Sequence, residues 1–124
     1  AAVGQSRDLA GSAIDLNGFK LVKARLEGVD GKILRGLVDN LKIQLPDSVI
    51  VLAAVADGKV SLVAGVQGRA QALLKAGDVL SHIAGQIGGK GGGRADFAQG
   101  GGDDGPGLVK ALSELDSWLA SRQG

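Results

Sequence analysis

The sequence lacks several residue types on which common protein chemistries depend. None of its 124 residues is cysteine, so disulfide bonds, thiolate zinc sites and cysteine nucleophiles are excluded. It has a single histidine, His82, and no partners at a recognisable spacing complete a catalytic triad or a metal cluster. The aromatic residues are Phe19, Phe97 and Trp118, too few for a platform that stacks several unpaired bases. We therefore interpret His82 as structural and predict no catalytic residue and no metal site.

An excess of one charge and a long apolar run are missing as well. The formal net charge is +1, which does not by itself indicate nucleic-acid binding. No apolar run approaches the roughly 20 residues of a membrane-spanning helix, and no signal-peptide pattern opens the chain. With the absence of cysteine, this favours a cytoplasmic protein. The first residue is Ala1 rather than Met, which we interpret as the start of a processed or excised piece.

The remaining composition, with 44% hydrophobic and 22% charged residues, is that of one globular domain. The order of the predicted strands and helices makes its fold class α/β. Residues 1–12 are interpreted as the remnant of a preceding linker or helical segment, and residues 13–124 as the globular domain. The dipeptides Asn17-Gly18 and Asp57-Gly58 predict two hairpins, because type I′ turns need positive φ at both central residues. We predict a mixed sheet of about four strands, packed by three to four helices and carrying a glycine-rich loop. The predicted strands are residues 14–16, 19–26, 49–56 and 59–66; the predicted helices are residues 31–45, 68–87 with a break at Gly77-Asp78, and a closing helix from Pro106.

Glycine is abundant, and it is concentrated. The chain has 22 glycines, and 11 of them lie between Gly85 and Gly107. A Walker phosphate loop is excluded because Gly89-Lys90 is followed by Gly91 rather than by serine or threonine. A GxGxxG pattern beginning at Gly100 follows no predicted strand, so a dinucleotide site is not supported either.

The segment Gly88-Gly89-Lys90-Gly91-Gly92-Gly93-Arg94 leaves a predicted helix and has two explanations. Its glycines can present consecutive backbone N–H groups to an anion, with Lys90 and Arg94 beside them. Alternatively, they let the chain pass close to the sheet, where no side chain fits. A second basic set, Lys32, Arg35 and Lys42, shares one face of a predicted helix and is either a binding surface or a solvated face. Asp103-Asp104 is either a cation ligand pair or, as we favour, a solvated turn or helix cap.

The glycine segment also carries a family resemblance. Residues 88–102 closely resemble the signature GGKGGGRPDMAQxGG near the C-terminus of alanyl-tRNA synthetases, with Ala95 in place of the usual proline and Phe97 in place of methionine. The order of the flanking elements follows that family as well, so the resemblance covers about residues 13–123. It implies the C-terminal globular domain of a bacterial-type synthetase, of the DHHA1 class.

The resemblance implies a function as part of a larger enzyme. The domain would bind the outer corner of tRNA(Ala), so that the aminoacylation and editing centres of the synthetase act on one substrate. This region would carry no catalytic centre and no cofactor, whereas the parent ligase would use ATP, Mg²⁺ and Zn²⁺. Nucleic-acid contacts are expected from Gly89, Lys90, Gly91, Gly92, Gly93, Arg94 and Gln99, with Lys32, Arg35 and Lys42 as a secondary basic face.

Two other functions remain open from the sequence. The glycine-rich loop could instead contact a second subunit, which would make the chain a dimerisation domain. The chain could also be the nucleic-acid-holding half of a DHH-type phosphoesterase, whose catalytic residues would lie in another domain. Besides tRNA(Ala), we expect the other domains of the parent synthetase as partners, and we expect the isolated domain to be a monomer or a weak dimer.

Overall fold

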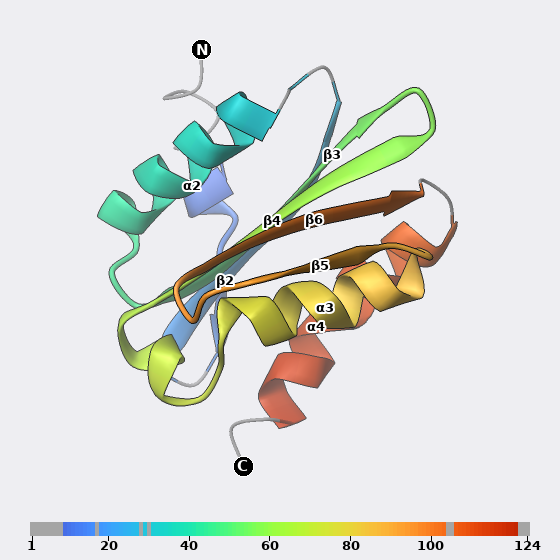
Figure 1. Ribbon diagram of the computed structural model, residues 1–124. Coiled ribbons are helices and arrows are strands. Elements are labelled where there is room, and N and C mark those ends of the chain that lie inside the picture. The colour runs from blue at the N-terminus through green and yellow to red at the C-terminus, as the bar shows by residue number, and fades with distance from the viewer. Residues whose placement is uncertain (1–8, 17, 28, 30, 104–105, 122–124) are drawn as a thin grey trace.

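The computed structural model describes residues 9–16, 18–27, 29, 31–103 and 106–121, and in this part of the chain a mixed sheet carries helices on both faces (Figure 1). The six described strands lie in the order β1-β2-β3-β4-β6-β5. They are β1 (Ile14–Leu16), β2 (Phe19–Glu27), β3 (Ser48–Ala56), β4 (Lys59–Gln67), β5 (Lys90–Gly93) and β6 (Phe97–Asp103). The helices are α2 (Gly31–Gln44), the short 3₁₀ helix η1 (Gly68–Ala72), α3 (Ala76–Gln86) and α4 (Pro106–Ser121).

The predicted α/β class and the two predicted hairpins are confirmed. Asp57 and Gly58 have φ angles of 53° and 76°, as a type I′ turn between β3 and β4 requires. Leu16 pairs with Phe19 across β1 and β2, so two residues connect these strands; Gly18 has φ 108°, and Asn17 lies outside the described residues. β2 and β3 are parallel and are joined through α2, whereas the other neighbouring strands are antiparallel.

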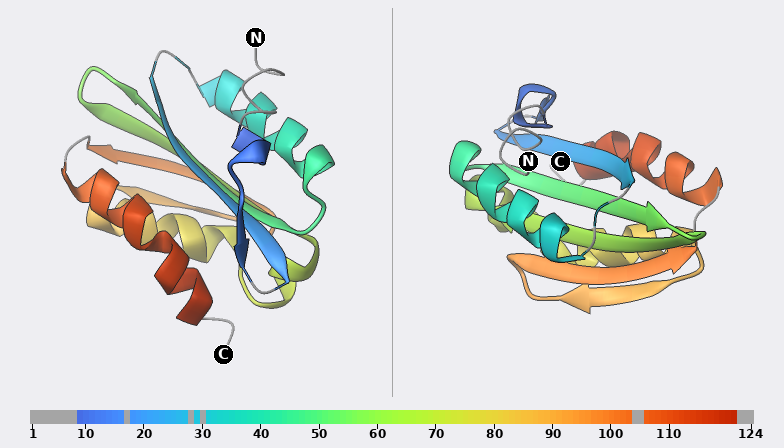
Figure 2. Two further views of the ribbon diagram at one scale, coloured as in Figure 1. Left: turned by 180° about the vertical axis from the view of Figure 1, so that it is seen from behind. Right: turned by 90° about the horizontal axis from the view of Figure 1, so that it is seen from above.

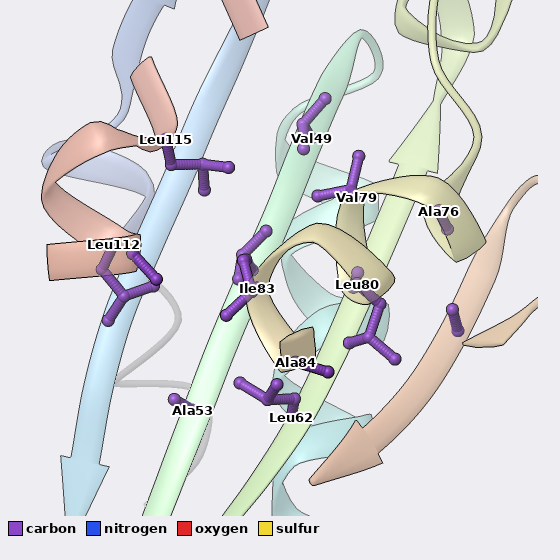
Figure 3. Close-up of a cluster of buried hydrophobic side chains, with 14 of the residues drawn as sticks. Val49, Ala53, Leu62, Ala76, Val79, Leu80, Ile83, Ala84, Leu112 and Leu115 are labelled. Atoms are coloured by element: carbon purple, nitrogen blue, oxygen red, sulfur yellow. The ribbon is translucent and has the colours of Figure 1, made fainter. Parts of the chain in front are cut away.

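The sheet separates two apolar clusters, because alternate residues of a strand point to opposite faces. One cluster is packed by α3 and α4, where Leu80 and Ile83 of α3 reach the side chains of β3 and β4 (Figure 3). The other is packed by α2 on the opposite face (Figure 2). Strand β3 is buried on both faces along nearly its whole length, which explains its almost continuous run of apolar residues.

The helix predicted over residues 68–87 is divided into η1 and α3. The break predicted at Gly77-Asp78 comes earlier in the chain, because α3 begins at Ala76 and its N-cap position is Lys75. Asp78 lies instead in the first helical turn, where a carboxylate is stabilised by the helix dipole. His82 of α3 stacks on Trp118 of α4, with ring centroids 4.2 Å apart and planes inclined by 12°. This contact between the two helices fits the structural interpretation of His82.

The sheet has more strands than the sequence predicts, because the glycine-rich segment is not a loop. Lys90–Gly93 forms β5 and pairs antiparallel with residues 98–101 of β6, and β6 in turn pairs with β4. Glycines carry no side chains and therefore show no apolar alternation, which is the pattern by which a strand is identified in a sequence. The count of about four strands was therefore too low by two.

The two ends of the chain are less fully described. Of the predicted N-terminal remnant, residues 1–8 lie outside the described part, while residues 9–11 are helical, and Leu9 and Ala10 pack against the cluster beneath α2. The closing helix begins at Pro106 as predicted. No helix among the described residues is both long and apolar enough to cross a membrane.

The core on the α3 side provides a test of the fold. Ile83 is completely buried between α3 and the sheet, so Ile83→Ala leaves a cavity and should lower the free energy of unfolding by about 2–5 kcal/mol. Urea denaturation followed by circular dichroism measures this difference. Ile43→Ala is the matched control, because Ile43 on α2 is 79% exposed and should change stability by no more than about 0.5 kcal/mol. Equal losses in the two variants would contradict the packing described here.

Candidate nucleic-acid interface

The glycine segment begins with a helix cap. Gly88 has φ 67°, and the N–H of Gly89 donates to the carbonyl of Ala84 at 2.9 Å. A left-handed residue just after the helix, followed by an N–H that bonds back to the last turn, is the Schellman arrangement. Gly88 is therefore required by the way α3 ends.

Most of the following glycines are required by close backbone packing. A Cβ on Gly100 would lie 2.5 Å from both the Cα of Gly91 and the carbonyl oxygen of Lys90, and a Cβ on Gly91 would lie 2.5 Å from Leu80 Cδ2. Real Cβ atoms do not approach other heavy atoms so closely, so β5, β6 and α3 fit together only without these side chains. Gly89, Gly93, Gly101 and Gly102 are confined by neighbouring backbone or side-chain atoms in the same way.

Gly92 is the exception in this segment. A Cβ built on Gly92 would meet nothing within 4 Å, and its φ is not in the left-handed region. The residue is exposed in the middle of β5. Neither folding nor packing therefore requires glycine at position 92, and the bare backbone there leaves room for a molecule from solution.

The expected cradle of consecutive free amides is not formed. In an antiparallel ladder, alternate residues direct their N–H groups to the partner strand. The N–H of Arg94 donates to the carbonyl of Phe97 at 2.9 Å, and Gly92 is paired with Gln99 in the same ladder. On the outer side of β5, the hydroxyl of Ser81 donates to the carbonyl of Gly91 at 3.2 Å. The strand therefore offers separate backbone groups along an edge rather than a nest.

One face of the sheet is left uncovered beside α2. Helix α2 packs on β3 and on part of β4, while β6 and β5 extend past it (Figures 1 and 2). Phe97 of β6 contacts the α2 side of the sheet, so alternate residues after it face the same way. The strand register adds the residues paired with them. We call this surface the open face; it comprises Lys59, Ser61, Lys90, Gly92, Gln99 and Gly101.

Two adjoining hollows between α2 and the open face bring together some of the predicted residues, whereas Gly89, Lys90, Gly91 and Lys42 line neither hollow. The larger, of about 630 Å³, is lined by Lys32 and Arg35 of α2 together with Ser61 and Gln99 of the sheet. The smaller, of about 240 Å³, is lined by Arg35, Gly92, Arg94 and Gln99, among others. The glycine segment and the basic residues Lys32 and Arg35 of α2, far apart in the sequence, thus form one site. Arg35 and Gln99 line both of its parts.

The arginine at the centre of the site is held in place by an aromatic ring. The guanidinium carbon of Arg35 lies 4.9 Å from the centroid of the Phe97 ring, which is a cation–π contact. Arg35 itself remains exposed. The methionine usual in the family signature would also offer an apolar surface here, but Phe97 adds a π face that attracts the charge.

Lys42 of the secondary basic set has a structural position instead. Its Nζ donates to the backbone carbonyl of Asp96 at 3.1 Å, and its side chain is half-buried beside Gly65. It ties α2 to the turn between β5 and β6. Helical spacing predicts that Lys42 shares a face with Lys32 and Arg35. It does not predict that the Lys42 side chain extends across the sheet to the backbone of Asp96.

The acidic residues nearby are mostly paired. Arg94 lies 3.7 Å from Asp96, and both side chains are largely exposed. Lys59 and Asp103 form an ion pair of 2.8 Å, and the hydrogen bond and charge of Asp103 raise the pKa of Lys59 above its usual 10.5. Within the described residues, Lys32 and Lys90 have no ion-pair partner, so their charges are available to a ligand.

The possible cation site at Asp103-Asp104 receives no support from its surroundings. Asp103 is bound by Lys59, and Asp104 lies outside the described residues. In the described part of the chain, no group of three or more histidine, cysteine or acidic side chains is placed to hold a metal ion.

The fold and this site place the chain in a known class of domain. The DHHA1 domain family matches residues 18–121, so the chain belongs to that family. It is 57% identical over 121 residues to an alanine–tRNA ligase of Stenotrophomonas maltophilia and 57% identical over 123 residues to one of Xanthomonas campestris. These alignments cover 98% and 99% of this chain but only 14% of each ligase, so the chain spans about a seventh of these relatives.

A solved structure has the same fold. The C-Ala domain of alanyl-tRNA synthetase from Aquifex aeolicus superimposes with a TM-score of 0.79 at 29% identity, covering 88% of this chain and 98% of that one. The resemblance drawn from residues 88–102 is thus confirmed over nearly the whole chain.

The packing of the glycine hairpin can be tested by adding single methyl groups. Gly100→Ala places a Cβ against two backbone atoms that cannot rotate away, and it should destabilise the fold by about 1–3 kcal/mol. Gly92→Ala is the matched control on the paired strand, and it should change stability by less than about 0.5 kcal/mol. Urea unfolding of both variants measures the difference. If both were neutral, the close approach of β5 and β6 would be refuted.

Proposed function

We propose that this chain is the tRNA-binding C-terminal domain of an alanine–tRNA ligase and that it holds the outer corner of tRNA(Ala). The observation that carries the proposal is that cations of α2 and of the glycine segment line adjoining exposed hollows. Lys32 and Arg35 come from α2 and Arg94 from the β5–β6 hairpin, and Gly92, Gly93 and Gly100 line the same hollows. Lys90 is exposed nearby on the open face, where it pairs with Gly101. The relationship to alanine–tRNA ligases supports tRNA as the nucleic acid.

The physical basis is charge placed beside a surface without side chains. Phosphate contacts from lysine and arginine position a nucleic acid without reading its sequence. The bare backbone at Gly92 lets a sugar–phosphate chain approach closely. Because only a few cations are involved and the net charge of the chain is +1, binding should be weak and should show a shallow dependence on salt.

The rest of the proposal concerns the whole enzyme. Holding one tRNA would let separate aminoacylation and editing centres act on it in the cytoplasm. ATP, Mg²⁺ and Zn²⁺ would be bound by other domains of the ligase. The domain would act as a monomer or a weak dimer that adds affinity to the catalytic parts.

Removing two charges tests the binding surface. Lys90→Ala with Arg94→Ala should weaken the binding of a tRNA(Ala) transcript and reduce the slope of log K against log salt by about 2. The melting temperature should hardly change, because both side chains are exposed. Fluorescence anisotropy at several salt concentrations measures both quantities. Arg69→Ala with Lys110→Ala, a pair of exposed charges away from the open face, is the matched control.

The proposal would be refuted if the double variant bound tRNA as well as the unchanged chain does. A tight dimer without tRNA affinity, detected by sedimentation, would favour the subunit-contact function instead. Phosphodiesterase activity of this chain alone would contradict a purely binding role.

The role of Gly92 can be separated from charge. Gly92→Val suits a strand and meets open space, so the fold should be retained, but its side chain should keep the RNA backbone from the surface. We expect reduced tRNA affinity with an unchanged salt slope, because no charge is altered. Gly85→Ala, at an exposed position on α3 with equally open space, is the control. Normal binding by Gly92→Val would show that the backbone at this position is not approached.

A further inference from the structure

We infer that Gln99 is a specificity-determining residue, whose amide recognises a ribose 2′-hydroxyl and so selects RNA over other nucleic acids. This rests on the proposed function and assigns a role that the surrounding cations cannot perform. Lysine and arginine attract the phosphates of RNA and DNA alike. Discrimination at the same site needs a contact with the 2′-hydroxyl itself, and a neutral group that both donates and accepts hydrogen bonds can make it without competing for phosphate.

Gln99 lies at the centre of the open face. Gln99 pairs with Val63 of β4 on one side and with Gly92 of β5 on the other. Gly101 lies on the same face, two residues further along β6. Its side chain is exposed, and among the described residues it has no hydrogen-bond partner. The residues next to Gln99 toward the sheet edge are therefore glycines, and no side chain there covers its amide.

The cations lie to either side of this amide. Gln99 lines the larger hollow together with Lys32 of α2, and it lines the smaller hollow together with Arg94 of the hairpin. Successive phosphates of a nucleic-acid strand would be attracted to the cations of the two hollows. The sugar that joins these phosphates would then lie over the middle of the open face. Gln99 lies there beside Arg35, and these two residues line both hollows.

The chemistry of the amide fits a hydroxyl better than it fits the other groups of a nucleotide. A carboxamide has two N–H donors and an oxygen acceptor, and the 2′-hydroxyl is both a donor and an acceptor. A phosphate oxygen uses only the donors and is attracted far more strongly by the nearby cations. Base stacking has no free aromatic surface in this position, because the ring of Phe97 carries the guanidinium of Arg35.

The experiment compares two ligands of similar shape on three proteins. The ligands are a synthetic tRNA(Ala) and its fully 2′-fluoro counterpart, which retains A-form geometry but cannot donate from the 2′ position. The proteins are the unchanged chain, Gln99→Leu and Lys90→Gln. Gln99→Leu keeps the size of the side chain and removes the amide, while Lys90→Gln removes a charge from the adjacent strand.

The expected result is a loss of selectivity confined to one variant. Gln99→Leu should bind the natural RNA about three- to tenfold more weakly, as one lost hydrogen bond allows, and should bind the 2′-fluoro RNA as the unchanged chain does. Its ratio of the two affinities should therefore fall towards one. Lys90→Gln should weaken both ligands equally and leave that ratio unchanged. Thermal melts of both variants should match that of the unchanged chain.

Two outcomes would overturn the inference, and they are distinguishable. If Lys90→Gln weakens binding but Gln99→Leu keeps the unchanged ratio, Gln99 does not recognise the hydroxyl, and the proposed function stands. If the unchanged chain binds neither ligand, the proposed function fails and this inference fails with it.

Discussion

The close packing of β5 against β6 and α3 is the constraint on which the site depends. Backbone atoms approach so nearly here that a Cβ at Gly91, Gly93 or Gly100 would overlap with a neighbouring atom. The hairpin can therefore lie flat against α3 and extend the sheet beyond the edge that α2 covers (Figure 1). Without this extension, only strand β4 would lie beside the basic residues of α2, and the smaller hollow would not form.

The packing also separates two roles within one glycine-rich segment. Gly88 has a structural role because it ends helix α3. Most of the glycines after it also have a structural role, because they allow β5, β6 and α3 to pack closely. Gly92 has neither role, although it lies among them in the sequence. The glycine motif looks uniform in the sequence, but its positions differ. The fold requires glycine at most of them and does not require it at position 92. Of the two explanations weighed from the sequence, close packing accounts for most of these glycines, whereas the consecutive free amides of the other are not formed.

The same distinction applies to the basic residues. Lys32, Arg35 and Lys42 follow helical spacing and look equivalent, yet Arg35 is positioned over Phe97 while Lys42 is bound to the backbone of Asp96. Helical spacing reports which side chains share a face, but it does not report what lies opposite that face. The β5–β6 hairpin, which comes about fifty residues later in the chain, gives Lys32, Arg35 and Lys42 their different surroundings.

The sequence by itself determined the local structure and the class of protein. Turn residues such as Asp57-Gly58, the apolar spacing of α2 and α4, and the continuous apolar run of β3 act over a few residues, and the motif at residues 88–102 indicated the family. The tertiary structure alone decided that the glycines form strands, that the consecutive-amide cradle does not exist, and that Gln99 lines the same hollows as the basic residues. Those features depend on which backbones approach each other across the sheet, and glycine, having no side chain, leaves no pattern in the sequence from which that approach can be predicted.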